Sequence, residues 1–188
     1  MLLSDRDIKK AIESGWVKIK PKIDYQTQLG SCSVDLRLDN IFQVFAEERC
    51  PHIDLRRPGK KFMRKIVVRQ GEAFIMKPGD FALASTMESV AMPDDLVGRI
   101  EGRSSLGRLG IIVHSTAAVC EPGSRGKIVM ELGNLGKISV SLYPGMRICS
   151  LAFEKLSSPA EIPYYKKKGA KYLGQKEPLP SKIGEEVK

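Results

Sequence analysis

The 188-residue chain has few of the residues that mark metal-dependent or disulfide-stabilised proteins. It holds only two histidines, His52 and His114, and neither belongs to an H-x-E or H-E-x-x-H motif. Its four cysteines form no C-x-x-C pair, so a tetrahedral zinc site would need scattered ligands. The sequence therefore predicts no zinc and four reduced, structural thiols, at positions 32, 50, 120 and 149.

The sequence also lacks the features of exported, membrane-spanning and disordered chains. No apolar run approaches the length that spans a bilayer, and the opening "MLLSDRDIKK" becomes charged after three residues, unlike a secretory signal. A hydrophobic content of 42% with 28% charged residues is typical of a globular chain. We expect a single domain over residues 1–188, no membrane partner and a cytoplasmic location.

Positive charge is in excess. The formal net charge of +9 favours an anionic partner, such as nucleic acid or a phosphorylated small molecule. Six lysines fall in "YYKKKGAKYLGQKEPLPSK", residues 164–182, which is either a solvated basic tail or a segment that binds anions. Aromatic residues make up only 6%, and no RNP, zinc-finger or arginine-rich motif occurs. A nucleic-acid-binding module is therefore a distant alternative.

Short apolar segments between turn residues predict a mainly β fold. Ser4 and Asp7 resemble a capping box that opens a short helix over residues 5–14, and Gly15 ends it. Strand candidates then recur about every ten residues, with turn-like stretches such as "RLDN" (37–40) between them, which favours a sandwich or barrel. The candidates are residues 33–38, 40–45, 63–68, 72–76, 81–86, 96–102, 111–116, 127–132, 138–143 and 147–156. From residue 157 the chain turns polar and basic, and we expect a tail that becomes ordered only on binding.

The stretch "GRSSLGRLG", residues 102–110, has the composition of an anion site. It is not a P-loop, because no Gly-Lys-Ser/Thr follows the glycines. Ser104 begins a predicted helical turn, and Arg108 returns to the same face four residues later. Together with Arg103 these groups suit a polyphosphate, because guanidinium forks match phosphate oxygens. A surface turn whose arginines pair with local acids is an equal alternative.

Two glutamates stand out further along the chain. In "GKIVMELGN" (126–134), strand alternation puts Glu131 on the face of Val129 and opposite Met130. It is either a solvent-facing residue or a site carboxylate with a tuned pKa. Glu121 precedes a Pro-Gly turn, where an acid often serves only as a turn acceptor.

The order of these motifs resembles the dCTP deaminase family of the dUTPase-like superfamily. The matching stretches are "LSDRDI", "SVDLRL", "GRSSLGRLG", "VHSTA", "PGSRGKIVMEL", "YPGM" and "AKYLGQK", which together run from Leu3 to about Lys182. The resemblance implies a distorted β-barrel or jelly-roll-like dUTPase-type fold with a short N-terminal helix and a few helical turns. It also implies homotrimers whose active sites are shared between subunits.

The resemblance implies an enzyme that hydrolyses the 4-amino group of dCTP to give dUTP and ammonia, which feeds dUMP and dTTP synthesis. The family does so without zinc, so a carboxylate must move the protons, and Glu131 matches that residue. An alternative within the family is the bifunctional enzyme that carries dCTP on to dUMP and pyrophosphate. dTTP inhibits many relatives, and dUTP is a further possible ligand.

The family also implies a set of substrate contacts. Backbone near Ser104 and Ala117 would hold the base and water, and the basic tail (about 157–188) would close over the triphosphate. Mg²⁺ would be bound mainly by phosphate oxygens, with no metal ligands from the protein. The substrate-binding residues implied are Arg103, Ser104, Ser105, Leu106, Gly107, Arg108, Ala117, Glu121, Val129, Met130, Tyr164, Lys171 and Gln175.

The chain departs from the family pattern at a few positions. Glu121 stands where an aspartate is usual, and its extra methylene changes the reach toward the deoxyribose. "TAAV" (116–119) stands where strict deaminases carry His-Arg, and Cys149 and Ser150 replace a glycine and a glutamine. Because the matching aspartate helps dUTPase relatives to activate water, Glu121 favours dUTP over dUMP as the product.

Overall fold

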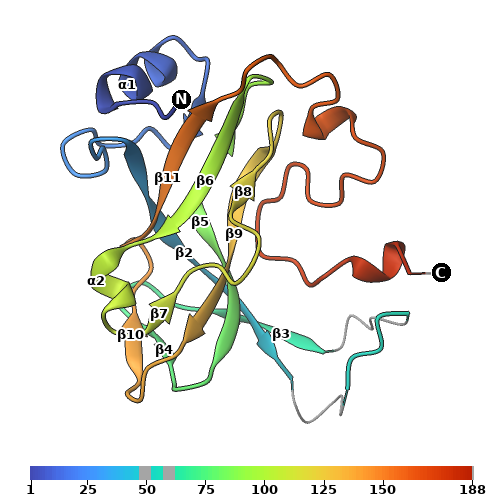
Figure 1. Cartoon of the computed structure of the whole chain (residues 1–188). Helices are drawn as coiled ribbons and strands as arrows, with labels where there is room; N and C mark the ends of the chain where they lie inside the picture. Colours follow the sequence, from blue (N-terminus) through green and yellow to red (C-terminus); the bar gives the residue numbers. More distant parts are fainter. Residues whose placement is uncertain (47–51, 57–61, 188) are drawn as a thin grey trace.

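The computed structural model describes residues 1–46, 52–56 and 62–187, and in these ranges the chain is mainly β (Figure 1). Nine strands form one curled sheet, whose main path runs β7-β9-β5-β2-β11-β6-β8, with β1 paired to β5 and β3 paired to β2. Their bounds are β1 Lys18–Lys20, β2 Ser33–Phe45, β3 Met63–Val67, β5 Phe81–Ala91, β6 Leu96–Gly102, β7 Ile111–Ile112, β8 Val119–Cys120, β9 Arg125–Asn134 and β11 Arg147–Lys155. This confirms the predicted mainly β, barrel-like fold.

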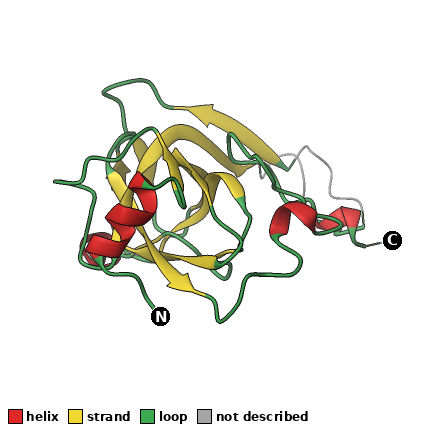
Figure 2. Cartoon of the chain, turned by 90° about the horizontal axis from the view of Figure 1, so that it is seen from above, coloured by secondary structure: helices red, strands yellow, loops and turns green. Residues whose placement is uncertain are grey.

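A two-stranded sheet and a few short helices complete the described structure. Strands β4 (Phe74–Met76) and β10 (Val140–Leu142) pair antiparallel. Seen from above, the strands curl around a common interior, and the C-terminal segment lies on the opposite side from the N-terminal helix (Figure 2). The helices are α1 Asp5–Glu13, α2 Ser104–Gly107, η2 Tyr164–Lys166 and η3 Ile183–Glu185. No helix in these ranges is long and apolar enough to cross a membrane.

The core lies inside the curl and joins the two sheets. Phe42 of β2 and Phe74 of β4 stack with ring centroids 4.2 Å apart, and both rings are buried. Such a pair contributes about 0.5–1.5 kcal/mol beyond the apolar area it buries. Alternate residues of β11, including Leu151 and Phe153, also point into this core, so the small sheet closes one end of the larger one.

Helix α1 forms where the sequence predicts it. The Ser4 hydroxyl accepts a hydrogen bond from the Asp7 amide at 3.4 Å, which caps the first turn. Ile8 and Ala11 bury one face of the helix against the core. Gly15 follows with φ 75°, a left-handed conformation that glycine adopts without strain.

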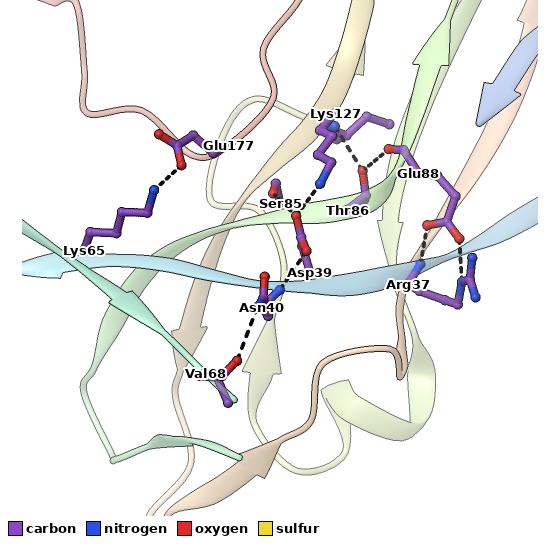
Figure 3. A network of polar contacts seen from close by, with 11 residues as sticks. Arg37, Asp39, Asn40, Lys65, Val68, Ser85, Thr86, Glu88, Lys127 and Glu177 are labelled. Atoms are coloured by element: carbon purple, nitrogen blue, oxygen red, sulfur yellow. Dashed lines mark hydrogen bonds and ion pairs between the residues drawn. The ribbon is translucent and has the colours of Figure 1, made fainter. Parts of the chain in front are cut away.

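Strand β2 differs from the prediction of two strands with a turn at residues 37–40. It runs unbroken over Ser33–Phe45, although its pairing with β5 shifts register between Leu38 and Phe42. The turn-type residues have partners on neighbouring segments, because Arg37 pairs with Glu88, Asp39 with Lys127, and Asn40 bonds to the Val68 carbonyl (Figure 3). These non-local bonds satisfy the polar groups and keep the segment in the sheet.

The C-terminal tail lies along β9, and its ordering on binding stays a prediction. The Gly174 amide bonds to the Arg125 carbonyl at 2.8 Å, and the Lys127 amide bonds to the Gln175 carbonyl at 2.8 Å. Glu177 forms an ion pair with Lys65 of β3 (Figure 3). The tail therefore occupies backbone groups at the β9 edge.

Candidate active site

A cavity of about 410 Å³ lies between β8, β9 and the C-terminal tail, segments that run side by side in Figure 1. Its wall comes from strands on one side and from the tail on the other. The structure brings together here six of the residues that the sequence singled out. They are Ala117, Glu121, Val129, Glu131, Tyr164 and Gln175.

Glu131 is held at the cavity wall by the segment after β7. Its neighbours Met130 and Leu132 are buried in the core, so strand alternation turns Glu131 to the opposite face, as predicted. The Ser115 amide donates to Glu131 Oε2 at 2.9 Å and the Thr116 amide at 3.4 Å. Among the described residues, all hydrogen bonds to this carboxylate go to Oε2, which leaves Oε1 for water or substrate.

The two backbone amides have a chemical consequence. They donate to a carboxylate, and charge-assisted bonds of this kind are stronger than neutral ones. They fix the orientation of the carboxyl plane without neutralising its charge. A carboxylate fixed this way at a cavity wall can take a proton from a water molecule and hold it for transfer.

Glu121 lies at the mouth of the cavity and contacts the tail. The Lys167 ammonium lies 3.3 Å from Glu121 Oε1 and 3.5 Å from Oε2. Both side chains are about half exposed, at 45% for Glu121 and 54% for Lys167, so the pair adds little stability. The Tyr164 amide bonds to the Pro122 carbonyl at 2.8 Å, so the tail meets the Pro-Gly turn at two points.

Sequence reasoning missed several residues that line the cavity. His114 is one of them, and its buried Nδ1 has no hydrogen-bond partner within the described residues. The "VHSTA" motif was the available signal, because it holds His114 beside the segment that binds Glu131. The others had no local signal, since the tail and the sheet bring them together, and they include Lys127, Tyr172, Leu179 and Ser181.

One of the described thiols lines this cavity. Cys120 lines it, and burial raises the pKa of its thiol to about 12, so the group is protonated at neutral pH. Burial also raises the pKa of Cys149 above its usual range. Cys32 is exposed, and Cys50 lies outside the described residues. The carboxylates are therefore better suited to acid–base work here than the thiols.

The arginine-serine loop lies outside this cavity within one chain. Its predicted helical turn is confirmed as α2, with Leu106 buried in the core. Arg108 Nε lies 3.5 Å from Ser104 Oγ, on the same face, as the spacing predicts. Arg103 pairs instead with the carboxylate of Asp35 at 3.1 Å, which is the local-acid alternative.

Two further predicted residues are also set apart from the cavity lining. The prediction for Met130 concerns its backbone, because its side chain is in the core, and that backbone contact stays a prediction. Lys171 pairs with Glu186 at 2.5 Å. The predicted residues that the cavity lining does not include are Arg103, Ser104, Ser105, Leu106, Gly107, Arg108, Met130 and Lys171. No three His, Cys, Asp or Glu side chains of the described ranges gather as metal ligands.

The structure defines the class as a curled β-sheet protein with a carboxylate oriented by backbone amides at a cavity wall. Comparison with known families is more specific. The chain belongs to the dCTP deaminase-like family, whose profile matches residues 2–156.

Individual relatives agree with this assignment. The chain is 60% identical over 189 aligned positions to a protein of Thermomicrobium roseum named dCTP deaminase, with 100% of this chain and 96% of that protein covered. It is 52% identical to a Dictyoglomus thermophilum protein named dCTP deaminase, dUMP-forming, with 97% and 95% covered. The two names differ in the product, so the relatives fix the family and leave the product open.

One solved structure supports the fold. The 2'-deoxycytidine 5'-triphosphate deaminase of Agrobacterium tumefaciens superposes with a TM-score of 0.64 at 20% identity. The match covers 82% of this chain and 47% of that longer chain, so this chain corresponds to about half of it.

Proposed function

We propose that this protein hydrolyses the 4-amino group of the cytosine in dCTP, releasing ammonia. The observation that carries the proposal is Glu131, held by two backbone amides at the wall of a cavity large enough for a nucleoside. Close relatives named dCTP deaminase support it, because the 60% identity extends over the whole chain.

Glu131 performs the proton transfers in this proposal. As a carboxylate it takes a proton from the attacking water, and the resulting hydroxide adds to C4 of the ring. The protonated Glu131 then delivers its proton to N3. It next takes the proton of the new C4 hydroxyl and passes it to the amine, so that the C4–N bond breaks, ammonia leaves, the C4 carbonyl forms and Glu131 returns to the carboxylate. The amides of Ser115 and Thr116 keep the carboxylate in one orientation throughout.

We propose dUTP as the product. A second hydrolysis, at the α-phosphorus, needs its own base, and Glu121 occupies the position where the family pattern has an aspartate. The Glu121 carboxylate is paired with the Lys167 ammonium of the tail, which favours a role in holding the tail over one as a base. The dUMP-forming name of the Dictyoglomus relative keeps release of dUMP and pyrophosphate as the second candidate.

The triphosphate site is proposed to be completed by a second copy of the chain. The Arg103–Arg108 loop is set apart from the cavity of its own chain, so a homotrimer with shared sites supplies the missing cations from a neighbour. Mg²⁺ enters with the triphosphate, which supplies most of its oxygen ligands. The tail that already lines the cavity closes over the nucleotide, and dTTP competes for the same place. The cytoplasm, where deoxynucleotide pools are kept, is the expected location.

A product assay tests the proposal. The purified protein is incubated with Mg²⁺ and dCTP, dUTP or CTP in turn, and the nucleotides are separated by anion-exchange chromatography. We expect dUTP from dCTP, no consumption of dUTP and slow turnover of CTP. Accumulation of dUMP as the main product would show the bifunctional activity, and no change in dCTP would overturn the proposal.

A further inference from the structure

Asp35 lies at the base of the arginine-serine loop, between two arginines that come from different strands. Its Oδ2 is 3.1 Å from Arg103 Nε and 3.2 Å from Arg147 Nη1. The Asp35 side chain is only 18% exposed, and that of Arg103 25%, so water screens this pair less than a surface pair. Asp35 belongs to β2, Arg147 begins β11, and Arg103 follows the end of β6.

The other oxygen of Asp35 is fixed by Ser150. The Ser150 hydroxyl donates to Asp35 Oδ1 at 2.6 Å, and the two residues are direct partners in the pairing of β11 with β2. The carboxylate therefore has one oxygen bonded to a hydroxyl and the other to guanidinium groups. The pairing of β11 with β2 therefore sets the position of this carboxylate.

Arg103 is held by this arrangement and still has donors to spare. Its Nε is paired with Asp35, and its Nη1 donates to the Arg147 carbonyl at 3.2 Å. A guanidinium has five N–H groups, so about three remain for phosphate oxygens. Arg103 is also the N-cap residue of α2, and no side-chain cap bond fixes that end of the helix. The contacts that fix the Arg103 side chain therefore also fix the position at which the loop begins.

We propose that Asp35, itself fixed by Ser150, is the positioning residue of the triphosphate loop and acts through Arg103. This rests on the proposed function, in which the loop binds the triphosphate. Asp35 fixes the guanidinium through Nε and leaves about three N–H groups for the ligand, and an oriented guanidinium of this kind recognises phosphate. The proposal gives Ser150, which departs from the family pattern, a defined role.

The alternative is that the Asp35–Arg103 ion pair only stabilises the fold. Another ion pair of the chain provides a matched control for that alternative. Arg99 of β6 and Glu154 of β11 form an ion pair at 2.6 Å across the same two strands. Both strands also flank the Asp35 network, but this pair has no contact with the loop. Glu154→Gln removes a strand-to-strand ion pair and leaves the loop contacts in place.

The test measures affinity for dCTP by calorimetry, in the presence of Mg²⁺ and in a Glu131→Gln background that does not consume the nucleotide. Asp35→Asn and Arg103→Ala should each raise Kd at least about tenfold, because a misplaced phosphate ligand loses charged hydrogen bonds. The Kd of the double variant should lie within about threefold of the higher Kd of the two single variants, because both changes break the same series of contacts. Glu154→Gln should leave Kd unchanged.

Ser150 provides a milder variant pair that keeps the fold intact. Ser150→Thr retains the hydroxyl and should keep the Kd for dCTP, whereas Ser150→Ala should weaken binding of dCTP and leave binding of dCMP nearly unchanged. A general loss of stability would affect both nucleotides and would appear in the melting temperature, which is measured for every variant. Equal behaviour of the two Ser150 variants contradicts the role of Ser150.

Three results would overturn the inference. The first is an unchanged Kd for dCTP in Asp35→Asn. The second is a double variant whose fold-change in Kd equals the product of the fold-changes of Asp35→Asn and Arg103→Ala. The third is a Glu131→Gln parent that does not bind dCTP. The proposed function is tested separately by turnover of the wild-type chain. A wild-type chain that binds dCTP without deaminating it would contradict the proposed function. The Kd values of the variants for dCTP would still test the role of Asp35.

Discussion

At the scale of single residues, Glu131 is the carboxylate to which we assign the proton transfers. Its place on β9 follows from the alternation of the strand, and its orientation follows from amides that belong to a different segment. The acid and the groups that orient it are separated by about fifteen residues of chain, so only folding brings them together. The local sequence predicted the face of the strand and gave no account of the donors.

Replacing Glu131 by glutamine keeps the shape and removes the base. We expect kcat for dCTP deamination to fall at least about 1000-fold, in line with the contribution of general acid–base catalysis. The Kd for dCTP should stay within a few-fold of wild type, because the amide still occupies the cavity wall. Steady-state ammonia release measures the first quantity and calorimetry the second.

The matched control is Glu72→Gln, an exposed carboxylate that is not part of the cavity lining. It should deaminate dCTP at the wild-type rate. If Glu131→Gln keeps more than about a tenth of wild-type turnover, a different group supplies the base.

At the scale of elements, the contact between β9 and the tail shapes the cavity. Gly126 has φ 124°, and a Cβ there would lie 2.6 Å from the Gln175 amide nitrogen and 2.8 Å from its carbonyl oxygen. Only a residue without a side chain allows the tail to approach the strand this closely. The tail residues Tyr172 and Gln175 line the cavity because of this approach.

We therefore predict that Gly126→Ala displaces the tail. Trypsin should cleave at the tail lysines faster than in wild type, hydrogen exchange at the Lys127 amide should accelerate, and kcat/KM for dCTP should fall. Limited proteolysis followed by mass spectrometry measures the first effect.

Gly145→Ala separates this effect from backbone strain. Gly145 has φ 87°, so alanine costs about 1–2 kcal/mol of left-handed strain there as well, yet a Cβ meets no atom within 4 Å. It should lower the melting temperature and leave tail protection at the wild-type level. Equal cleavage of the two variants would contradict the role of the Gly126 contact.

At the scale of the whole molecule, the cavity that Glu131 lines and the arginine-serine loop lie apart within a single chain. Exposed apolar side chains lie near the loop, among them Leu109, Leu135 and Ile138. Together with the loop beside them they are suited to contact with another subunit, because apolar area is usually buried in stable interfaces. We expect a mass of three 20.8 kDa chains by light scattering.

A subunit-mixing experiment tests whether active sites are shared. Glu131→Gln and Arg108→Ala chains are each nearly inactive, the first from loss of the base and the second from loss of a phosphate contact. Unfolded and refolded together in equal amounts, they should recover about a quarter of wild-type activity, if each site takes Glu131 from one chain and Arg108 from another. If each site lies within one chain, the mixture stays as inactive as its components.

Features that arise from local chemistry could be predicted from the sequence. The capped helix α1, the mainly β fold, the face of Glu131 and the helical turn at Ser104 all follow from residue patterns that span a few positions. Patterns of this kind report local backbone preference and which side of an element is apolar, and both can be read along the chain.

Contacts between distant segments could not be predicted from the sequence and are seen only in the folded chain. The unbroken β2, the tail on β9, the Asp35–Arg103 pair and His114 in the cavity wall all depend on partners far apart in the chain. A polar residue reads as a turn or a surface position until its partner is known, because the same side chain is stable in a sheet once its charge is paired. For that reason the sequence was sufficient for the family and for the strand face of Glu131, and the geometry of the site required the fold.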